Sequence, residues 1–236
     1  MRREQDLQAI EQGLDALIFD FDGVLVDSDE LHWEAYRRAF AAFEIDFRLA
    51  DYVERAKGHG RDVVVGKFAG SLPAEDRAEI ARLKASHAEQ IVSEGELHPV
   101  AGVRPFLESA RSRGLLCAVA STSVLAPIAV EAIGLAGAFD AVCARLPEER
   151  SKPAPDIFLR SFASVNARAD RCLVIEDTPT GVRAGLSAGA SVVVRGCEAD
   201  WAEEADAPKL AGIFETFDDL HERLGWGRLD PSGEAQ

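Results

Sequence analysis

Residues 16–32 read ALIFDFDGVLVDSDELH, an order of residue types that suggests a strand followed by a site. The stretch starts with apolar residues, 16–19, which favour a buried β-strand. Two carboxylates, Asp20 and Asp22, come next, and Gly23 follows them directly. Burying a charge is costly unless it is paired or bound to a metal. These acids therefore predict a binding site at the end of a strand, or else a solvated strand end whose acids form a turn.

The rest of the chain alternates short apolar runs with helical patterns. Strand candidates lie at 16–20, 115–120, 140–144, 172–176 and 191–195, and helical stretches lie near 124–134, 155–165 and 180–188. Strands that are apolar on both faces and alternate with helices predict a parallel sheet covered by helices, which is the α/β class. In such a sheet, binding sites lie beyond the carboxyl ends of the strands.

Residues 30–95 interrupt this alternation, because they contain no comparable strand run. The segment ELHWEAYRRAFAAF, 30–43, has helical spacing, and a second helical pattern starts at Pro73 and stops near Gly95. We therefore expect a helical domain over 29–98, inserted into a discontinuous core of residues 1–28 and 99–236. The end of this core, 225–236, is polar and rich in Gly and Pro, which predicts a frayed terminus.

Composition narrows the possible partners. The 236-residue chain carries 26 Lys and Arg against 41 Asp and Glu, a net charge of −15 that disfavours nucleic acids and membrane surfaces as partners. No apolar run approaches the roughly 18 residues of a membrane helix, and the charged first residues are unlike a signal peptide. The cysteines, none in a C-x-x-C pair, favour reduced thiols and a cytoplasmic location; they are Cys117, Cys143, Cys172 and Cys197. Composition does not fix the oligomeric state.

Other strand candidates end in chemistry that matches the first. The second ends at Ser121, Lys152 lies in SKPAPD after the third, and the fourth ends in Glu176 and Asp177. Taken singly, these are a loop serine, a surface lysine and an acidic pair that caps a helix. Because the carboxyl ends of parallel strands share one edge of the sheet, the residues together predict a single site.

This ordered set of motifs resembles the haloacid dehalogenase superfamily, and in particular its β-phosphoglucomutase and sugar-phosphatase-like members. The resemblance runs from about residue 16 to 196, through DFDGVLVDS, Ser121, Lys152 and the pair Glu176–Asp177. It implies a doubly wound, Rossmann-like α/β core with an inserted α-helical cap domain. It also implies that the acid at position 22 separates this chain from dehalogenases, which have no oxygen leaving group to protonate.

The resemblance assigns roles that ordinary carboxylate chemistry supports. Asp20 would attack phosphorus and form an aspartyl phosphate, and Asp22 would act as acid and then as base. Lys152 and Ser121 would hold phosphoryl oxygens. A hard cation prefers oxygen ligands. The expected ligands of a Mg²⁺ cofactor are Asp20, Asp22 through its backbone carbonyl, Asp177 and Glu176.

The inserted domain is expected to carry substrate specificity. The candidates for substrate binding, with one from the core, are His32, Lys57, Gly58, Arg61, Lys84 and Thr122. Lys and Arg form charge-assisted hydrogen bonds with phosphate and sugar-acid oxygens. The alternative is a solvated basic surface with a hinge histidine. Leu125 stands where β-phosphoglucomutases hold a second phosphate with polar residues, which counts against mutase activity.

These features favour a Mg²⁺-dependent phosphatase of a small phosphorylated metabolite, with a sugar phosphate as the preferred class. The first alternative is a β-phosphoglucomutase-like isomerase, which returns the phosphoryl group to a sugar. A more remote alternative is a non-enzymatic phospho-receiver domain. Such a domain needs neither the helical insertion at 30–95 nor a leaving-group acid at Asp22.

Overall fold

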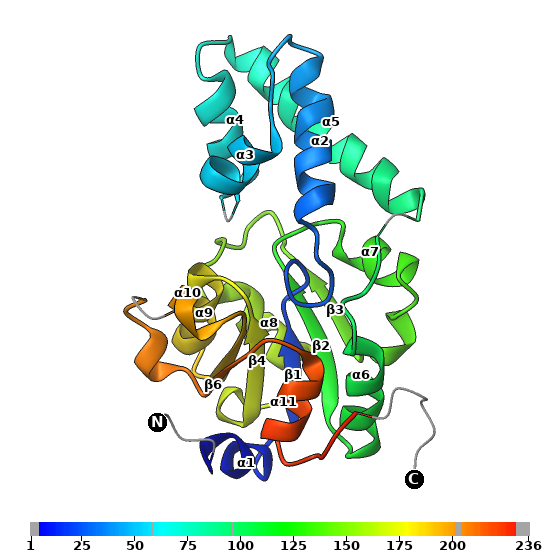
Figure 1. Cartoon of the computed structure of the whole chain (residues 1–236), viewed down its shortest axis with the longest axis vertical. Coiled ribbons are helices and arrows are strands. Elements are labelled where there is room, and N and C mark those ends of the chain that lie inside the picture. The colour runs from blue at the N-terminus through cyan, green and yellow to red at the C-terminus, as the bar shows by residue number, and fades with distance from the viewer. Residues whose placement is uncertain (1–4, 58, 96, 202–203, 230–236) are drawn as a thin grey trace. The chain divides into compact units, whose positions relative to one another are not determined.

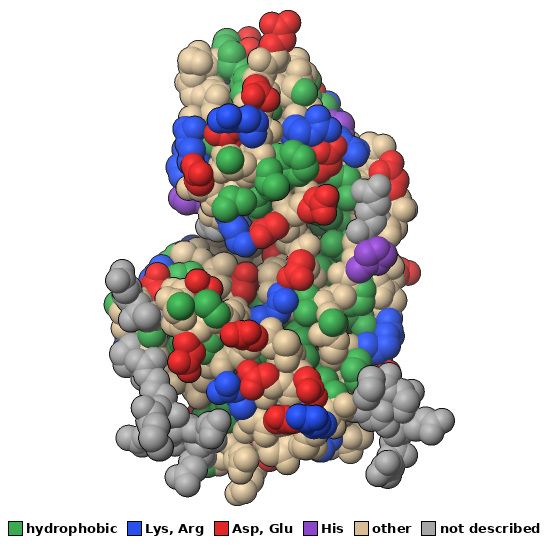
Figure 2. All heavy atoms as spheres, viewed as in Figure 1, with side chains coloured by type: hydrophobic (Ala, Val, Ile, Leu, Met, Phe, Trp, Pro, Cys, Tyr) green, Lys and Arg blue, Asp and Glu red, His purple; other side chains and the backbone are tan. Residues whose placement is uncertain are grey.

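The computed structural model describes residues 5–57, 59–95, 97–201 and 204–229. The chain divides into two compact units. The first unit, the core, contains Met1–Val26 and Pro99–Gln236, and the second, the helical unit, contains Asp27–His98. None of the helices in the described ranges is long and apolar enough to cross a membrane. Figure 2 shows acidic and basic side chains interspersed over the face in view.

The core is built on one sheet of parallel strands in the order β3-β2-β1-β4-β5-β6 (Figure 1). The strands are β1 Ala16–Phe19, β2 Leu116–Ser121, β3 Ala141–Ala144, β4 Cys172–Glu176, β5 Ser191–Arg195 and β6 Gly212–Phe214. The predicted parallel α/β sheet is confirmed, and five strands lie at the predicted stretches. β6 went unpredicted because three residues, GIF, are too few to show a period.

Helices cover both faces of this sheet, so the doubly wound architecture is confirmed. They are α1 Gln5–Glu11, α6 Val103–Ser112, α7 Ala126–Ala132, α8 Asp156–Ser164, α9 Pro179–Ser187, α10 Glu198–Trp201 and α11 Phe217–Arg223, with short 3₁₀ turns at Ala136–Ala138, Ala169–Arg171 and Ala207–Lys209. Successive residues of a strand point to opposite faces. Ile18 accordingly lies in one apolar cluster with Phe158 of α8. The ring of Phe19 lies 6.2 Å from Phe106 of α6 and 6.5 Å from Phe217 of α11.

The end of the core is packed as far as residue 229. The Trp226 ring lies 5.4 Å from that of Phe106, and its Nε1 donates to Glu11 Oε1 at 2.9 Å. His221 Nδ1 lies 2.8 Å from the carbonyl oxygen of Gly227. The prediction of a frayed terminus is therefore wrong for 225–229, because one aromatic side chain secures the segment against α6. Residues 230–236 lie outside the described ranges.

The helical unit has a core of its own. It contains α2 Asp29–Ala41, α3 Leu49–Asp51, a π-helix at Tyr52–Ala56, α4 Arg61–Ala69 and α5 Ala74–Ser93. The ring centres of Phe40 and Phe47 lie 5.0 Å apart with the rings tilted, and the ring of Phe68 lies 4.8 Å from that of Phe47. No strand occurs in the part of this unit that the structure describes. α5 begins one residue after Pro73 and ends just before Gly95, whose φ of +78° is left-handed.

Candidate active site

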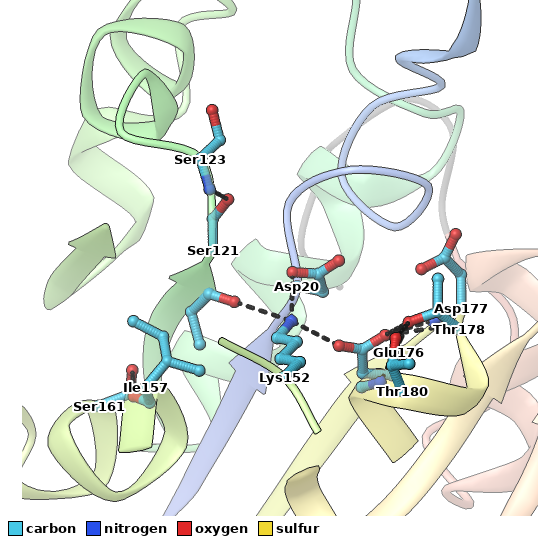
Figure 3. A network of polar contacts seen from close by, with 12 residues as sticks. Asp20, Ser121, Ser123, Lys152, Ile157, Ser161, Glu176, Asp177, Thr178 and Thr180 are labelled. Carbon is cyan, nitrogen blue, oxygen red and sulfur yellow. Dashed lines mark hydrogen bonds and ion pairs between the residues drawn. The ribbon is translucent and has the colours of Figure 1, made fainter. Parts of the chain in front are cut away.

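The Lys152 ammonium lies at the centre of the carboxyl edge of the sheet (Figure 3). Its Nζ donates to Asp20 Oδ1 at 2.7 Å, to Glu176 Oε1 at 2.5 Å and to the carbonyl oxygen of Ala120 at 3.3 Å. These partners come from the ends of β1, β4 and β2. One lysine therefore joins three neighbouring strand ends, as the combined motifs predict.

Strand register explains why the two acids meet. Phe19 lies beside Ile175 in the parallel ladder between β1 and β4. The next residue, Asp20, continues that ladder by donating its backbone N–H to the carbonyl oxygen of Ile175 at 2.9 Å. This contact places Asp20 next to Glu176, the last residue of β4. Their side chains are therefore close enough to share one lysine.

Glu176 is fully buried, and protein donors engage both of its carboxylate oxygens. Oε1 accepts from Lys152, while Oε2 accepts from the backbone N–H groups of Asp177 at 3.0 Å and Thr178 at 3.2 Å, and from the Thr178 hydroxyl at 3.1 Å. A side chain at Gly181 would clash, because a Cβ there would lie 1.8 Å from Glu176 Oε1. Glu176 is thus an anchor that orients Lys152 and the turn after β4.

Asp177 lies against the loop that follows β1. A Cβ at Gly23, whose φ is +76°, would lie 1.9 Å from Asp177 Oδ2, so only glycine lets this backbone approach so closely. Oδ1 of Asp177 is buried and has no hydrogen-bond partner among the residues that the structure describes. A buried carboxylate oxygen without a donor is costly. The environment of this carboxylate oxygen therefore favours a positively charged ligand.

The pKa values of these side chains are shifted because the groups are buried close together. Burial, followed by the charges of Glu176 and Asp20, raises the pKa of Asp177 to about 9. Burial also raises the pKa of Asp20 to about 7, although the charge of Lys152 acts in the opposite direction. Burial alone would lower the pKa of Lys152, but the carboxylates of Asp20 and Glu176 outweigh it and raise the pKa.

The acidic cluster fits a hard divalent cation. Asp20, Glu176 and Asp177 each offer an oxygen, and these oxygens lie within 4.8 Å of one another. An all-oxygen donor set with net negative charge suits Mg²⁺ better than a softer metal. The donorless Oδ1 of Asp177 is the independent observation that favours a bound cation.

Without such a cation, we expect stability to fall as the pH rises. The raised pKa values of about 7 for Asp20 and about 9 for Asp177 mean that the folded protein binds more protons than the unfolded chain, whose aspartates ionise near pH ~4. The free energy of unfolding therefore decreases from about pH 4 to about pH 9. The Tm in chelator should drop by at least about 3 °C between pH ~5 and pH ~8.5.

Mg²⁺ should restore most of this loss at the upper end of the range, because it offsets the ionised carboxylates. Asp177→Asn is the matched variant, since it keeps the shape of the side chain and removes one charge. It should melt at a higher temperature than the parent in chelator at high pH, and gain little from Mg²⁺. A parent Tm that climbs with pH in chelator would contradict the argument.

Ser121, Thr122 and Asp22 lie at the same edge of the core. Ser121 ends β2, is 1% exposed and accepts a hydrogen bond at Oγ from the Ser123 backbone N–H at 3.0 Å. Its neighbour Thr122 is exposed. Asp22 is half-buried, and its charge acts on both Asp20 and Asp177. Among the site residues predicted from the sequence, Asp20, Lys152 and Glu176 are joined by direct hydrogen bonds, while Ser121, Thr122 and Asp22 lie nearby at the same edge.

The basic residues expected to bind substrate lie in the helical unit, in two groups. In the first, Lys84 Nζ lies 3.1 Å from His32 Nδ1 and 5.1 Å from the centre of the Tyr36 ring. Because an ammonium can only donate, Nδ1 is the acceptor in this contact. These two residues, 52 positions apart in sequence, therefore form one polar unit.

The second group lies around the start of α4. Lys57 forms an ion pair with Asp29, whose other carboxylate oxygen accepts from the Tyr52 hydroxyl at 3.1 Å. Arg61 is half-exposed, with Nε 3.7 Å from the carboxylate of Asp62. Gly58 lies outside the described residues. Asp29 and Tyr52 were missed from the sequence, because the pairing depends on a turn between distant helices.

Several core residues that shape the site were also missed. Thr178 caps α9 by accepting a hydrogen bond from the Gly181 backbone N–H at 3.2 Å. Its own hydroxyl and backbone N–H both donate to Glu176. Gly181 leaves room for that carboxylate. The signal was present in EDTPTG, 176–181, where an N-cap threonine precedes a helix-starting proline and a glycine.

Comparison with known proteins identifies this constellation. Residues 14–189 match the profile of haloacid dehalogenase-like hydrolases. The chain belongs to this family. Membership in this hydrolase family confirms the resemblance stated from the motifs, and it sets aside the non-enzymatic receiver domain.

Relatives of this haloacid dehalogenase-like hydrolase include both phosphatases and mutases. Hexitol phosphatase A of Escherichia coli is 31% identical over 188 residues, covering 78% of this chain and 83% of that protein. β-Phosphoglucomutase of Bacillus subtilis is 28% identical over 183 residues, covering 74% and 80%. The crystal structure of CbbY from Rhodobacter sphaeroides in complex with phosphate is 27% identical, with a TM-score of 0.74 over 90% of this chain and 99% of that one.

Proposed function

We propose that the protein is a Mg²⁺-dependent phosphatase that hydrolyses a small phosphorylated metabolite, preferably a sugar phosphate. The observation that carries this proposal is the buried Asp20 carboxylate held by Lys152 at 2.7 Å, at the edge of the sheet where ligands bind. The similarity to a hexitol phosphatase supports the choice of substrate class.

The chain's own residues account for each step of hydrolysis. An oxygen of Asp20 forms a bond to phosphorus while the bond from phosphorus to the ester oxygen breaks, giving an aspartyl phosphate. Asp22 gives its proton to the leaving oxygen, then takes a proton from the water that attacks phosphorus. That attack releases phosphate and restores the Asp20 carboxylate. Lys152 and Ser121 stabilise the phosphoryl oxygens throughout.

A Mg²⁺ ion would be held chiefly by Asp20, Asp177 and the backbone carbonyl of Asp22. Both oxygens of Glu176 are already engaged by protein donors, so its part is to hold Lys152 and the turn that carries Asp177. When bound, the cation would screen the repulsion between a carboxylate nucleophile and an anionic substrate. This assigns Glu176 a supporting role in place of the ligand role expected from the sequence.

We further propose that residues 29–98 act as a cap that supplies specificity. The residues proposed to contact substrate are His32, Lys57, Gly58, Arg61 and Lys84, with Thr122 from the core. The pairing of Lys84 with His32 and of Lys57 with Asp29 keeps these ammonium groups ordered before substrate arrives. Ordered donors lose less entropy on binding. All four cysteines are free thiols, which supports a role in the reducing cytoplasm.

Arg61→Ala tests the proposed specificity role. We expect kcat/KM for the true substrate to fall about 10- to 100-fold, because a charge-assisted contact is lost. The rate on p-nitrophenyl phosphate should stay within about 3-fold, since this ester offers the cap little to hold. Arg82→Ala is the matched control, because Arg82 is an exposed arginine of the same unit that pairs with Glu79.

The outcome separates recognition from fold. Equal losses on the two esters after Arg61→Ala would assign Arg61 to the chemistry or to folding. No loss on either ester would make it a solvated surface arginine.

A β-phosphoglucomutase-like isomerase is the second candidate, favoured by the similarity to that enzyme of Bacillus subtilis. Both reactions use the same aspartyl phosphate and differ in the acceptor. A panel of phosphorylated metabolites, assayed for phosphate release and for sugar phosphate isomerisation in parallel, distinguishes them. Phosphate release without isomerisation supports the phosphatase, and isomerisation with little release supports the mutase. No Asp20-dependent reaction on any metabolite would overturn both.

A further inference from the structure

Arg195 is a charged residue at the carboxyl edge of the sheet that none of the expected motifs contains. It ends β5. Val194 lies beside Glu176 in the ladder between β4 and β5, so Arg195 lies one residue beyond, next to the position of Asp177. β4 separates β1 from β5 in the sheet. The Arg195 side chain nevertheless reaches the loop after β1, where its Nη1 donates to the carbonyl oxygen of Gly23 at 2.8 Å.

The loop that receives this hydrogen bond is a tight turn directly after Asp22. The Gly23 backbone N–H donates to the carbonyl oxygen of Val26 at 2.8 Å, and the Val26 N–H donates to that of Phe21 at 3.2 Å. One side of Gly23 is pressed against the Asp177 carboxylate, as its missing Cβ requires. The carbonyl oxygen of Gly23 accepts the hydrogen bond of Arg195, a guanidinium from a different strand. Gly23, the residue directly after Asp22, is therefore held by Asp177 through one contact and by Arg195 through the other.

We propose that Arg195 is a positioning residue for proton transfer by Asp22, acting through the Gly23 carbonyl. The proposal rests on the phosphatase function proposed above. In that reaction the Asp22 O–H bond breaks and the proton moves to the ester oxygen as that oxygen leaves phosphorus. A guanidinium is always charged, and its hydrogen bond to a carbonyl is stronger than that of a neutral donor. Loss of this bond would free the Gly23–Val24 peptide and loosen the adjacent Asp22, and rates are sensitive to the placement of the acid.

A misplaced acid matters only where the leaving group needs a proton. An alkyl alkoxide, as in a sugar phosphate, is a poor leaving group, whereas p-nitrophenolate departs without protonation. Arg195→Met should therefore lower kcat on the alkyl phosphate about 10- to 100-fold, the range for partners that orient a functional group. The rate on p-nitrophenyl phosphate should stay within about 3-fold of the parent. This selectivity by leaving group is an effect that a purely structural role would not produce.

The experiment compares kcat on both esters at saturating Mg²⁺ for the parent, Arg195→Met, Arg195→Lys, Asp22→Asn and the double variant of Arg195→Met with Asp22→Asn. Lysine can still donate to the carbonyl, so Arg195→Lys should lower kcat selectively on the alkyl phosphate as well, but by a smaller factor. In the Asp22→Asn background, Arg195→Met should cause no further loss, because its effect passes through Asp22. Arg183→Met is the matched control, since Arg183 is a half-exposed arginine whose Nη1 lies 3.8 Å from Asp206.

Three results would overturn the proposal: equal loss on both esters, full activity of Arg195→Met on the alkyl phosphate, or an additional loss in the double variant. If Arg195→Met melts below the assay temperature, Arg195→Lys decides by the same ratio between esters. Failure of the phosphatase function gives a different result. In that case the parent hydrolyses neither ester, or hydrolyses it at a rate that Asp20→Asn does not reduce. The proposal for Arg195 then fails together with the phosphatase function.

Discussion

Replacing Asp20 with asparagine should reduce turnover by at least about 10⁴-fold on every phosphate ester, because a carboxamide cannot form the aspartyl phosphate. The substitution keeps the size of the side chain, and its amide oxygen can still accept from Lys152. The fold should therefore survive. Initial rates at saturating Mg²⁺ measure the loss, and circular dichroism with a thermal melt checks the fold.

The stability of the same variant gives an independent readout. Burial raises the pKa of Asp20 to about 7 although the charge of Lys152 opposes it, so a neutral side chain is favoured at this position above that pH. At pH ~8.5 in chelator, the variant should therefore melt at a temperature no lower than that of the parent. Intact-mass measurement excludes deamidation of the introduced amide, which would regenerate the nucleophile. Substantial turnover by a verified, uncontaminated variant would show that Asp20 is not the nucleophile.

Lys152→Ala should damage both activity and stability. It removes a cation from between Asp20 and Glu176, whose carboxylates are almost completely buried. Breaking a buried ion pair from one side costs about 3–5 kcal/mol, because the remaining charges stay uncompensated. Turnover should fall by at least about 10²–10³-fold on sugar phosphates and on p-nitrophenyl phosphate alike, since every substrate carries the phosphoryl group.

Arg150→Ala is the matched control for this variant. Arg150 lies two residues from Lys152, is largely exposed and pairs with Asp156, so its removal should leave both rates nearly unchanged. Urea denaturation gives the stability change, and Mg²⁺ should recover part of the loss. A Lys152→Ala protein that retains parent-like turnover would remove Lys152 from the chemistry, and unchanged stability would contradict the view that it offsets the buried acids.

The strand ends were predictable because each carries a local signal. An apolar run followed directly by Asp20, Ser121 or Glu176 shows where the core stops and polar chemistry starts, and parallel order then brings these ends together. The hydrogen-bond partners of Glu176 were not predictable. Its residue type fits a metal ligand, and only the structure shows that Oε1 accepts from Lys152 while Oε2 accepts from two N–H groups and a hydroxyl.

Features that depend on long-range packing escaped the sequence. In the sequence Arg195 resembles any charged residue at a strand end, and no local pattern predicts its contact with Gly23 across β4. Trp226 lies in a segment whose Gly and Pro content indicates disorder, yet one ring packed on Phe106 orders it. The pairing of Lys57 with Asp29 likewise needs two helices in place before it can form.

The order in which the chain is synthesised gives the central position of β1 a consequence for folding. Ala16 of β1 pairs with Leu116 and Cys172, both of which are made after the whole helical unit. On the ribosome, the helical unit can close around its own aromatic core while the apolar β1 still has no partner. Contacts between distant segments slow folding, and an unpaired apolar strand invites association between nascent chains. A chain interrupted before β2 therefore leaves the wholly apolar β1 without a strand to pair with.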